Sequence, residues 1–155
     1  DINPPSTELG ETNSDTLKYN ANGVHVGDAA QTQYGLSIRY EPTYNSYIKL
    51  RGTYFGDYYS DFDAGTLSGD NSGRESWVIP SYQLIDLHCG YKFKLFDHYK
   101  LDVKISILNL LDEIYISDAN NNDSYNTDYS DFDAKSASVF FGLGRRVNLS
   151  ARFNF

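Results

Sequence analysis

The residues best suited to chemistry lie in a hexapeptide that occurs twice. The sequence Tyr-Ser-Asp-Phe-Asp-Ala fills residues 59–64 and again residues 129–134. Its carboxylates and rings could hydrogen-bond and stack on a polar ligand, although strand ends of similar composition are the simpler interpretation. With one nearby tryptophan, which also suits a membrane interface, the candidate ligand-binding residues are Tyr59, Asp61, Asp63, Trp77, Asp131 and Asp133.

Calcium is the metal that such Asp-rich loops could bind. Residues 61–71 and 118–124 nevertheless lack the glycine and the closing glutamate of a helix-loop-helix calcium site. The sequence therefore predicts no cofactor, with loop-bound calcium as the single exception to consider.

Catalysis is not indicated by the remaining reactive side chains. His88 lies two positions from Asp86, on the same side of an expected strand, but no nucleophile accompanies the pair because Cys89 points to the opposite face. A single cysteine also excludes an intrachain disulfide. The net charge of -8 argues against nucleic-acid binding, which requires a basic surface. We therefore expect neither an enzyme nor a nucleic-acid-binding protein.

Strands must position these residues, because apolar and polar side chains alternate along most of the chain. No run approaches the roughly 18 apolar residues of a membrane helix. Residues 1–30 are expected to form a long loop with a partial strand, and residues 31–155 a set of strands. The expected strands are 31–41, 44–57, 85–93, 99–108, 136–143 and 147–155, joined by short turns at 42–43, 95–98 and 144–146 and by long polar segments at 58–76 and 118–133.

The two faces of these strands differ in charge. One face carries mid-strand charges and the other is almost free of them, as a water-filled lumen and a lipid bilayer would respectively require. The charged positions are Arg39, Lys49, Arg51, Asp86, Lys92, Asp102, Lys104 and Arg152. Aromatic residues cluster near strand ends, as in interfacial girdles. These features predict an all-β, antiparallel transmembrane β-barrel segment with long outer loops and short periplasmic turns.

Several segments resemble a known family. Residues 107–115 (Ile-Leu-Asn-Leu-Leu-Asp-Glu-Ile-Tyr), residues 139–146 and the strand ending in Phe155 resemble the C-terminal end of TonB-dependent outer-membrane receptors; residues 23–32 and 79–82 are also similar to segments of these receptors. One departure is Gly144, where many members have proline. The resemblance implies about six strands of a 22-stranded barrel in the outer membrane of a Gram-negative bacterium, without the plug domain. It also implies that Phe155 serves as an assembly signal.

The same resemblance implies function and partners. Receptors of this family import scarce or bulky solutes, such as an iron chelate, cobalamin, a glycan or a peptide. The implied partners are the remaining barrel strands and plug domain, a TonB-type energy transducer that contacts the plug, a surface lipoprotein and outer-membrane lipid. We expect the missing strands to form another chain or to have been removed by proteolysis. The terminal strand is expected to pair with residues 136–143 on one side.

Two other protein classes remain open from the sequence. A small, self-contained eight-stranded barrel acting as an adhesin or enzyme would need two further strands within residues 1–30. A soluble lipocalin-like binder would need apolar side chains lining its interior and polar ones facing outward.

Overall fold

The protein is all-β in the computed structural model, which describes residues 18–95, 99–121 and 134–155. The long strands form where apolar and polar residues alternate. Successive side chains of a strand point to opposite faces, so one face of each strand is apolar and the other is polar. The strands are β1 (Ala30–Thr43), β2 (Ser46–Tyr59), β3 (Val78–Ile79), β4 (Tyr82–Leu95), β5 (Tyr99–Leu108), β6 (Ile116–Asn121), β7 (Ala137–Phe141) and β8 (Arg146–Asn154). Two short 3₁₀ turns, η1 (Ala64–Thr66) and η2 (Gly69–Asn71), lie between β2 and β3.

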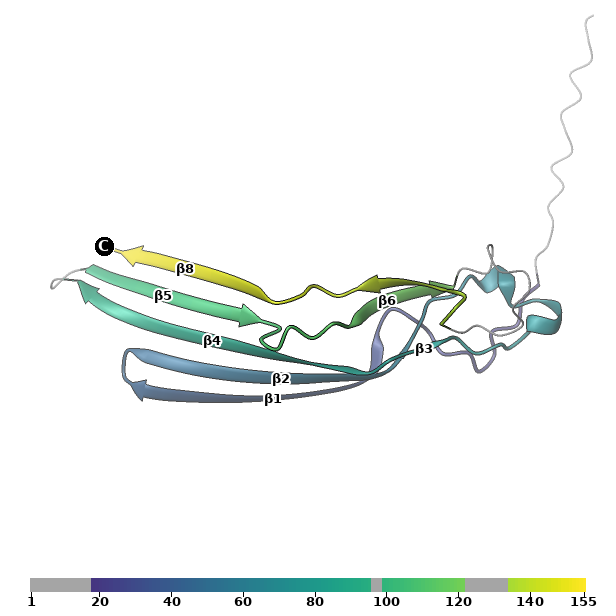
Figure 1. The fold of residues 1–155 in the computed structure, drawn as a ribbon, viewed down its shortest axis with the longest axis horizontal. Helices are drawn as coiled ribbons and strands as arrows, with labels where there is room; N and C mark the ends of the chain where they lie inside the picture. The colour runs from purple at the N-terminus through teal and green to yellow at the C-terminus, as the bar shows by residue number, and fades with distance from the viewer. Residues whose placement is uncertain (1–17, 96–98, 122–133) are drawn as a thin grey trace, which may run out of the picture.

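The main sheet is antiparallel and open. Its strand order is β1-β2-β4-β5-β8, with β3 beside the end of β2, and β6 pairs with β7 in a second sheet. Among the described residues, β1 and β8 are the edges of the main sheet and do not pair with each other. Figure 1 shows the C-terminus at the same end as the β1–β2 turn, with the 3₁₀ turns at the opposite end. Within the described ranges, no helix is long and apolar enough to cross a bilayer.

The predicted hairpin between residues 136–143 and the terminal strand is wrong. β7 pairs with β6, whereas β8 pairs with β5 in a register that runs from Lys100↔Asn154 to Leu108↔Arg146. Residues 142–145 do not turn because their backbone is bonded to the neighbouring segment: Gly142 N donates to Tyr115 O (2.8 Å) and Arg145 N to Asp112 Oδ1 (2.7 Å). β8 therefore lies antiparallel to β5 and beside it, and not beside β7 (Figure 1).

Other predicted boundaries are corrected more modestly. The third predicted strand, 85–93, extends to 82–95, and the polar segment expected at 118–133 begins as strand β6. No strand forms within residues 18–29, where a turn joins Val24 N to Ala21 O at 3.2 Å. A short turn after β1 and a long connection after β2 are confirmed, but the turn lies at residues 44–45 and not at 42–43, which belong to β1. The turn expected at 95–98 falls largely on residues 96–98, outside the described residues.

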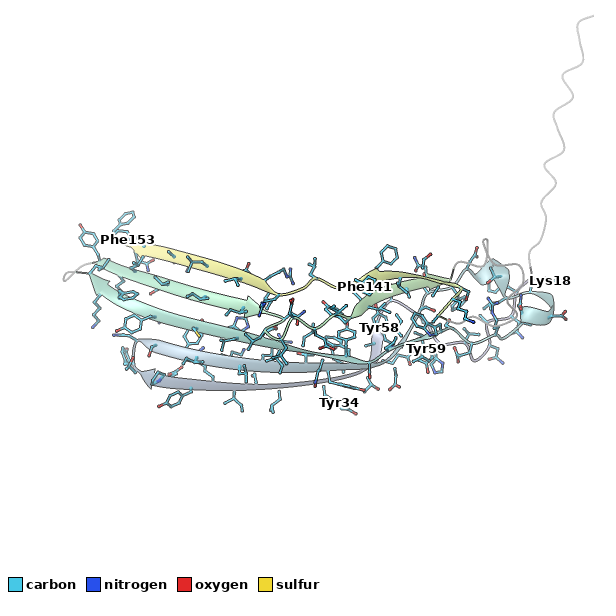
Figure 2. All side chains as sticks on the ribbon, viewed as in Figure 1. Lys18, Tyr34, Tyr58, Tyr59, Phe141 and Phe153 are labelled. Atoms are coloured by element: carbon cyan, nitrogen blue, oxygen red, sulfur yellow. The ribbon has the colours of Figure 1, made fainter. Side chains whose placement is uncertain are left out.

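The register separates the two faces as the alternation predicts. One row across all five long strands is entirely apolar, and the next row is polar. The apolar row is Ile38, Leu50, Leu87, Ile107 and Val147; the polar row is Arg39, Lys49, His88, Ser106 and Asn148. The apolar side chains are not covered by the protein, since Leu36 and Leu149 are 72% and 71% exposed. Figure 2 shows Tyr34 below β1 and Phe153 above β8, on the outer side of the curved sheet.

A small hydrophobic core lies at the long-loop end of the molecule. Tyr58, Ile79 and Ala119 are buried where β2, β3 and β6 meet, and the Tyr58 hydroxyl donates to Ser117 O at 2.7 Å. Partly buried apolar residues pack around this cluster: Ala30, Trp77, Tyr82, Ile116 and Val139. The core therefore fixes the base of the long loops, while the apolar face of the main sheet remains uncovered.

Candidate functional site

Three side chains from distant segments meet beside the first hexapeptide. The ring of His25 stacks on Tyr59 at the end of β2, with ring centroids 4.1 Å apart and planes 8° from parallel. Its Nδ1 lies 2.7 Å from Glu75 Oε2, and its backbone N–H donates to Glu75 Oε1 at 3.0 Å. These contacts attach the segment before β1 to the loop that precedes β3.

The charge of Glu75 is stabilised by this arrangement. Partial burial raises its pKa, but hydrogen bonds from the His25 backbone and ring and from the Ser76 amide outweigh burial and lower the pKa below its ordinary value. Glu75 therefore stays ionised at neutral pH and can hold both segments together.

The two aspartates of the first hexapeptide make different hydrogen bonds. Asp63 Oδ1 accepts the amide of Gly65 at 2.8 Å and so caps η1, a local role that Asp often fills. Asp61 Oδ1 accepts the adjacent Phe62 amide at 2.9 Å, while the Asp61 backbone N–H donates to Ala119 O at 2.7 Å. Both residues, with Phe62 and Asn120, line a shallow hollow at the long-loop end.

The close packing of this loop base depends on Gly27. A Cβ added at Gly27 would lie 2.6 Å from the Asp61 backbone nitrogen and 2.7 Å from its Cα. Only glycine lets the two backbones approach so closely. The segment before β1 thus packs closely against one side of the first hexapeptide.

Trp77 lies under the loops. It packs against the buried cluster, and its carbonyl accepts the Ser60 amide at 2.9 Å. Of the four described candidates, Tyr59, Asp61 and Asp63 follow one another around the end of β2, and Trp77 is joined to them through Ser60. Asp131 and Asp133, with most of the second hexapeptide, lie outside the described residues. Within the described ranges, no group of three or more His, Cys, Asp or Glu side chains is placed to hold a metal ion.

An aromatic stack lines the polar face just beneath the loops. Phe55 stacks on Tyr82 with centroids 4.8 Å apart, and Tyr82 on Tyr115 at 4.4 Å. A Cβ at Gly142 would lie only 2.0 Å from the Tyr115 ring, so the ring covers bare backbone there. This stack explains why Phe55, an apolar residue that breaks the alternation, lies on the polar face.

Asn109 organises the interruption between β5 and β6. It is 4% exposed and has a positive φ of 51°, which asparagine tolerates better than most residues. Its Oδ1 accepts Glu113 N at 2.8 Å, its Nδ2 donates to Glu113 O at 2.9 Å and Leu143 O at 3.4 Å, and its backbone N–H donates to Asp86 Oδ1 at 3.0 Å. The segment 107–115 is therefore bonded both to β4 and to the link between β7 and β8.

The polar face near the short turns contains an open groove. Residues of β1, β2, β4 and β5 line it, among them Arg39, Tyr47, Lys92, Asp102 and Lys104. The Arg39 guanidinium lies 4.1 Å over the Tyr47 ring, and Arg39 Nε is 2.7 Å from Glu41 Oε1. The Tyr47 ring in turn covers Gly90, whose added Cβ would lie 2.3 Å from it.

His88 and Asp86 share the polar face of β4, as predicted. His88 Nδ1 lies 2.9 Å from Ser106 Oγ on β5, and Asp86 accepts the Asn109 amide. Both side chains therefore bond to the same neighbouring segment, His88 within β5 and Asp86 just beyond its end.

Sequence reasoning missed His25, Glu75 and Asn109 as organising residues. His25 and Glu75 are 50 positions apart, and no local spacing relates them. For Asn109, the signal was present in the sequence, since an asparagine within an otherwise apolar strand pattern suggests a break or a left-handed residue.

The comparisons with known proteins identify no relative: the sequence matches no protein-family model and no curated protein.

Proposed function

We propose that this chain forms part of the wall of an outer-membrane β-barrel, and that the barrel is a TonB-dependent importer of a scarce or bulky solute. The resemblance of residues 107–115 and 139–146 to such receptors motivates the second part of the proposal. The chain's role is a rigid wall with polar lumen groups and outer loops, and it performs no chemistry on the solute.

One observation carries the barrel proposal: the outer-face positions that the register pairs across β1, β2, β4, β5 and β8 have no charged side chain and are left uncovered. From Tyr34 to Tyr40, β1 places an exposed apolar side chain at every second position. A lysine or arginine at mid-bilayer on such a face destabilises a barrel by about 2–4 kcal/mol, whereas an apolar side chain is favourable in contact with lipid.

Strand length is compatible with this role. An apolar band of about 25 Å crossed at a tilt of about 40° requires about 33 Å of strand. β5 has 10 residues and therefore measures about 33 Å at about 3.3 Å per residue. β1, β2 and β4, with 14 residues each, are long enough to extend beyond the band toward the loops.

The free edges support a larger barrel rather than the small self-contained one. In the described residues, β1 and β8 each lack a second neighbour, and an edge in lipid would leave backbone groups unbonded. Further strands are therefore required on both sides. The polar inner face also opposes a lipocalin-like binder, whose interior would be apolar.

The proposal is tested by extracting the protein from the membranes of its producing organism in mild detergent and determining the mass and composition of the particle. We expect a particle several times 17.6 kDa that includes further strands and a plug domain. Cross-linking in intact cells should capture an inner-membrane energy transducer. A folded species of 17.6 kDa in buffer without detergent would contradict the barrel proposal, and a complete barrel without a plug or transducer contact would contradict the import mechanism.

A further inference from the structure

Positive charge is concentrated on the inner face of the main sheet, although the whole chain has a net charge of -8. The register places nine of the chain's 13 lysines and arginines there: Arg39, Lys49, Arg51, Lys92, Lys94, Lys100, Lys104, Arg146 and Arg152. Glu41, Asp86 and Asp102 are the acidic residues on the same face of these strands. Of the other nine carboxylates in the described residues, seven lie outside the strands, so in this part of the chain the wall is basic and the connections are acidic: Asp28, Asp61, Asp63, Asp70, Glu75, Asp112 and Glu113.

Two cross-strand pairs on this face bring like charges directly opposite each other. Arg39 lies opposite Lys49, and Lys94 lies opposite Lys100. Directly opposite residues have Cβ atoms about 4.5–5.5 Å apart, and like charges at that separation destabilise a sheet. A sheet under selection for stability alone would have no reason to carry two such pairs.

Four of these nine cations have a carboxylate beside them: Arg39 is paired with Glu41, Arg51 lies opposite Asp86, and Lys92 and Arg152 lie on either side of Asp102. Among the described residues, the only ion pair that any of the nine forms is Arg39 with Glu41, and the carboxylate of Asp86 is bonded to the Asn109 amide. The register places no carboxylate directly opposite the other five cations, which therefore present uncompensated positive charge on the inner side of the sheet: Lys49, Lys94, Lys100, Lys104 and Arg146.

The character of the face favours a dissolved anion over a packed protein domain. The cores of protein interfaces are depleted in charged residues and enriched in apolar and aromatic ones. The row of Arg39 and Lys49 instead continues with the polar residues His88, Ser106 and Asn148. Ser37 lies in the next polar row, and Tyr47 already covers Gly90. We propose that this basic wall attracts an anionic solute, bearing carboxylate or phosphate groups, along the inner face of the sheet.

This inference rests on the proposed barrel, because it requires the basic wall to face an aqueous lumen. It deepens that proposal by specifying the charge of the solute. Electrostatic focusing at such a wall can raise the local concentration of an anion by tenfold or more at low salt.

The test uses nitroxide labels in the membrane-extracted protein, reconstituted in lipid vesicles, with Cys89→Ser removing the native thiol. A label at Ser37 reports on the basic wall, since Ser37 is opposite Arg51 and two residues from Arg39. A label at the adjacent Leu36 reports on the outer face. Collision with a trianionic chromium oxalate complex is compared with collision with a neutral nickel chelate.

At Ser37 we expect the anionic probe to be favoured about tenfold over the neutral one, and 1 M salt should remove the preference because it shortens the screening length to about 3 Å. The double variant Arg39→Gln and Lys49→Gln should lose most of the preference. The matched variant Lys18→Gln and Arg145→Gln removes two basic residues outside this face and should leave it unchanged.

Equal collision of both probes at Ser37, with Leu36 in contact with lipid, would overturn the anionic-solute inference and leave the barrel intact. Shielding of Ser37 from both probes would also overturn it, because a polypeptide would then cover the wall. A Leu36 label that meets water instead of lipid would overturn the barrel proposal itself.

Discussion

Replacing Asn109 by alanine should destabilise the protein by about 3 kcal/mol. The substitution removes two short side-chain hydrogen bonds to Glu113, at 2.8 and 2.9 Å, and a longer one to Leu143 O. Each short bond contributes about 1 kcal/mol. Alanine at a φ of 51° costs about 1 kcal/mol more.

Glycine at the same position separates the two contributions. Asn109→Gly loses the same hydrogen bonds but tolerates the positive φ, so it should cost about 2 kcal/mol. Asn148→Ala serves as a control, because Asn148 is an exposed residue on the polar face of β8; it should change stability by less than about 0.5 kcal/mol.

Urea unfolding of the reconstituted protein in lipid vesicles, followed by circular dichroism, measures these differences. Equal stability of Asn109→Ala and Asn148→Ala would contradict the structural role of Asn109. A lower stability of Asn109→Gly than of Asn109→Ala would show that the positive φ contributes nothing.

Three further predictions concern the faces and the loop base. Leu149→Arg should lower stability in lipid by about 2–4 kcal/mol while Ser150→Arg on the opposite face changes it little; equal effects in urea unfolding would contradict the assignment of the faces. Gly90→Ala should cost about 1–2 kcal/mol, because its Cβ meets the Tyr47 ring at 2.3 Å, whereas Gly35→Ala, with nothing within 4 Å, should not destabilise. In a Tyr47→Ala background the cost of Gly90→Ala should disappear, and its persistence would show that the ring is not the cause. Because the folded-state pKa of Glu75 is lowered, its stabilisation is present above the ordinary value of 4.5 and is lost as pH falls through the folded pKa. Amide exchange at His25 and Ser76 should therefore lose protection on that acid side only, and Glu75→Gln should remove the pH dependence; unchanged protection in acid would contradict this role.

The sequence predicts the faces of the sheet well, because side-chain alternation has a period of two and any correct strand assignment fixes both faces. The rows containing Leu50 and Lys49 follow directly from it. Pairing is harder to predict, because the same alternation is compatible with a turn or a straight continuation at residues 142–145. There the hydrogen bond from Arg145 N to Asp112, 33 positions away, decides the outcome.

The position of the first hexapeptide could be predicted from the sequence, and its ligand-binding role stays a prediction. The first hexapeptide was found by its repetition, and the structure places it at the long-loop end next to the buried cluster. Its stacking and ionic partners, His25 and Glu75, could not be predicted because the loops that carry them have no periodic pattern. Trp77 was identified from its type, yet only the structure shows that it packs against the buried cluster.

The most direct test of the central claim, that the sheet separates lipid from water, is a nitroxide scan of β8 in the reconstituted protein. Labels placed singly at each position from Arg146 to Asn154, in the Cys89→Ser background, are compared for collision with oxygen, which concentrates in lipid, and with a water-soluble nickel chelate. We expect an alternation of period two, with oxygen favoured at Val147, Leu149, Ala151 and Phe153 and the chelate favoured between them. Accessibility to the chelate at all nine positions would contradict it.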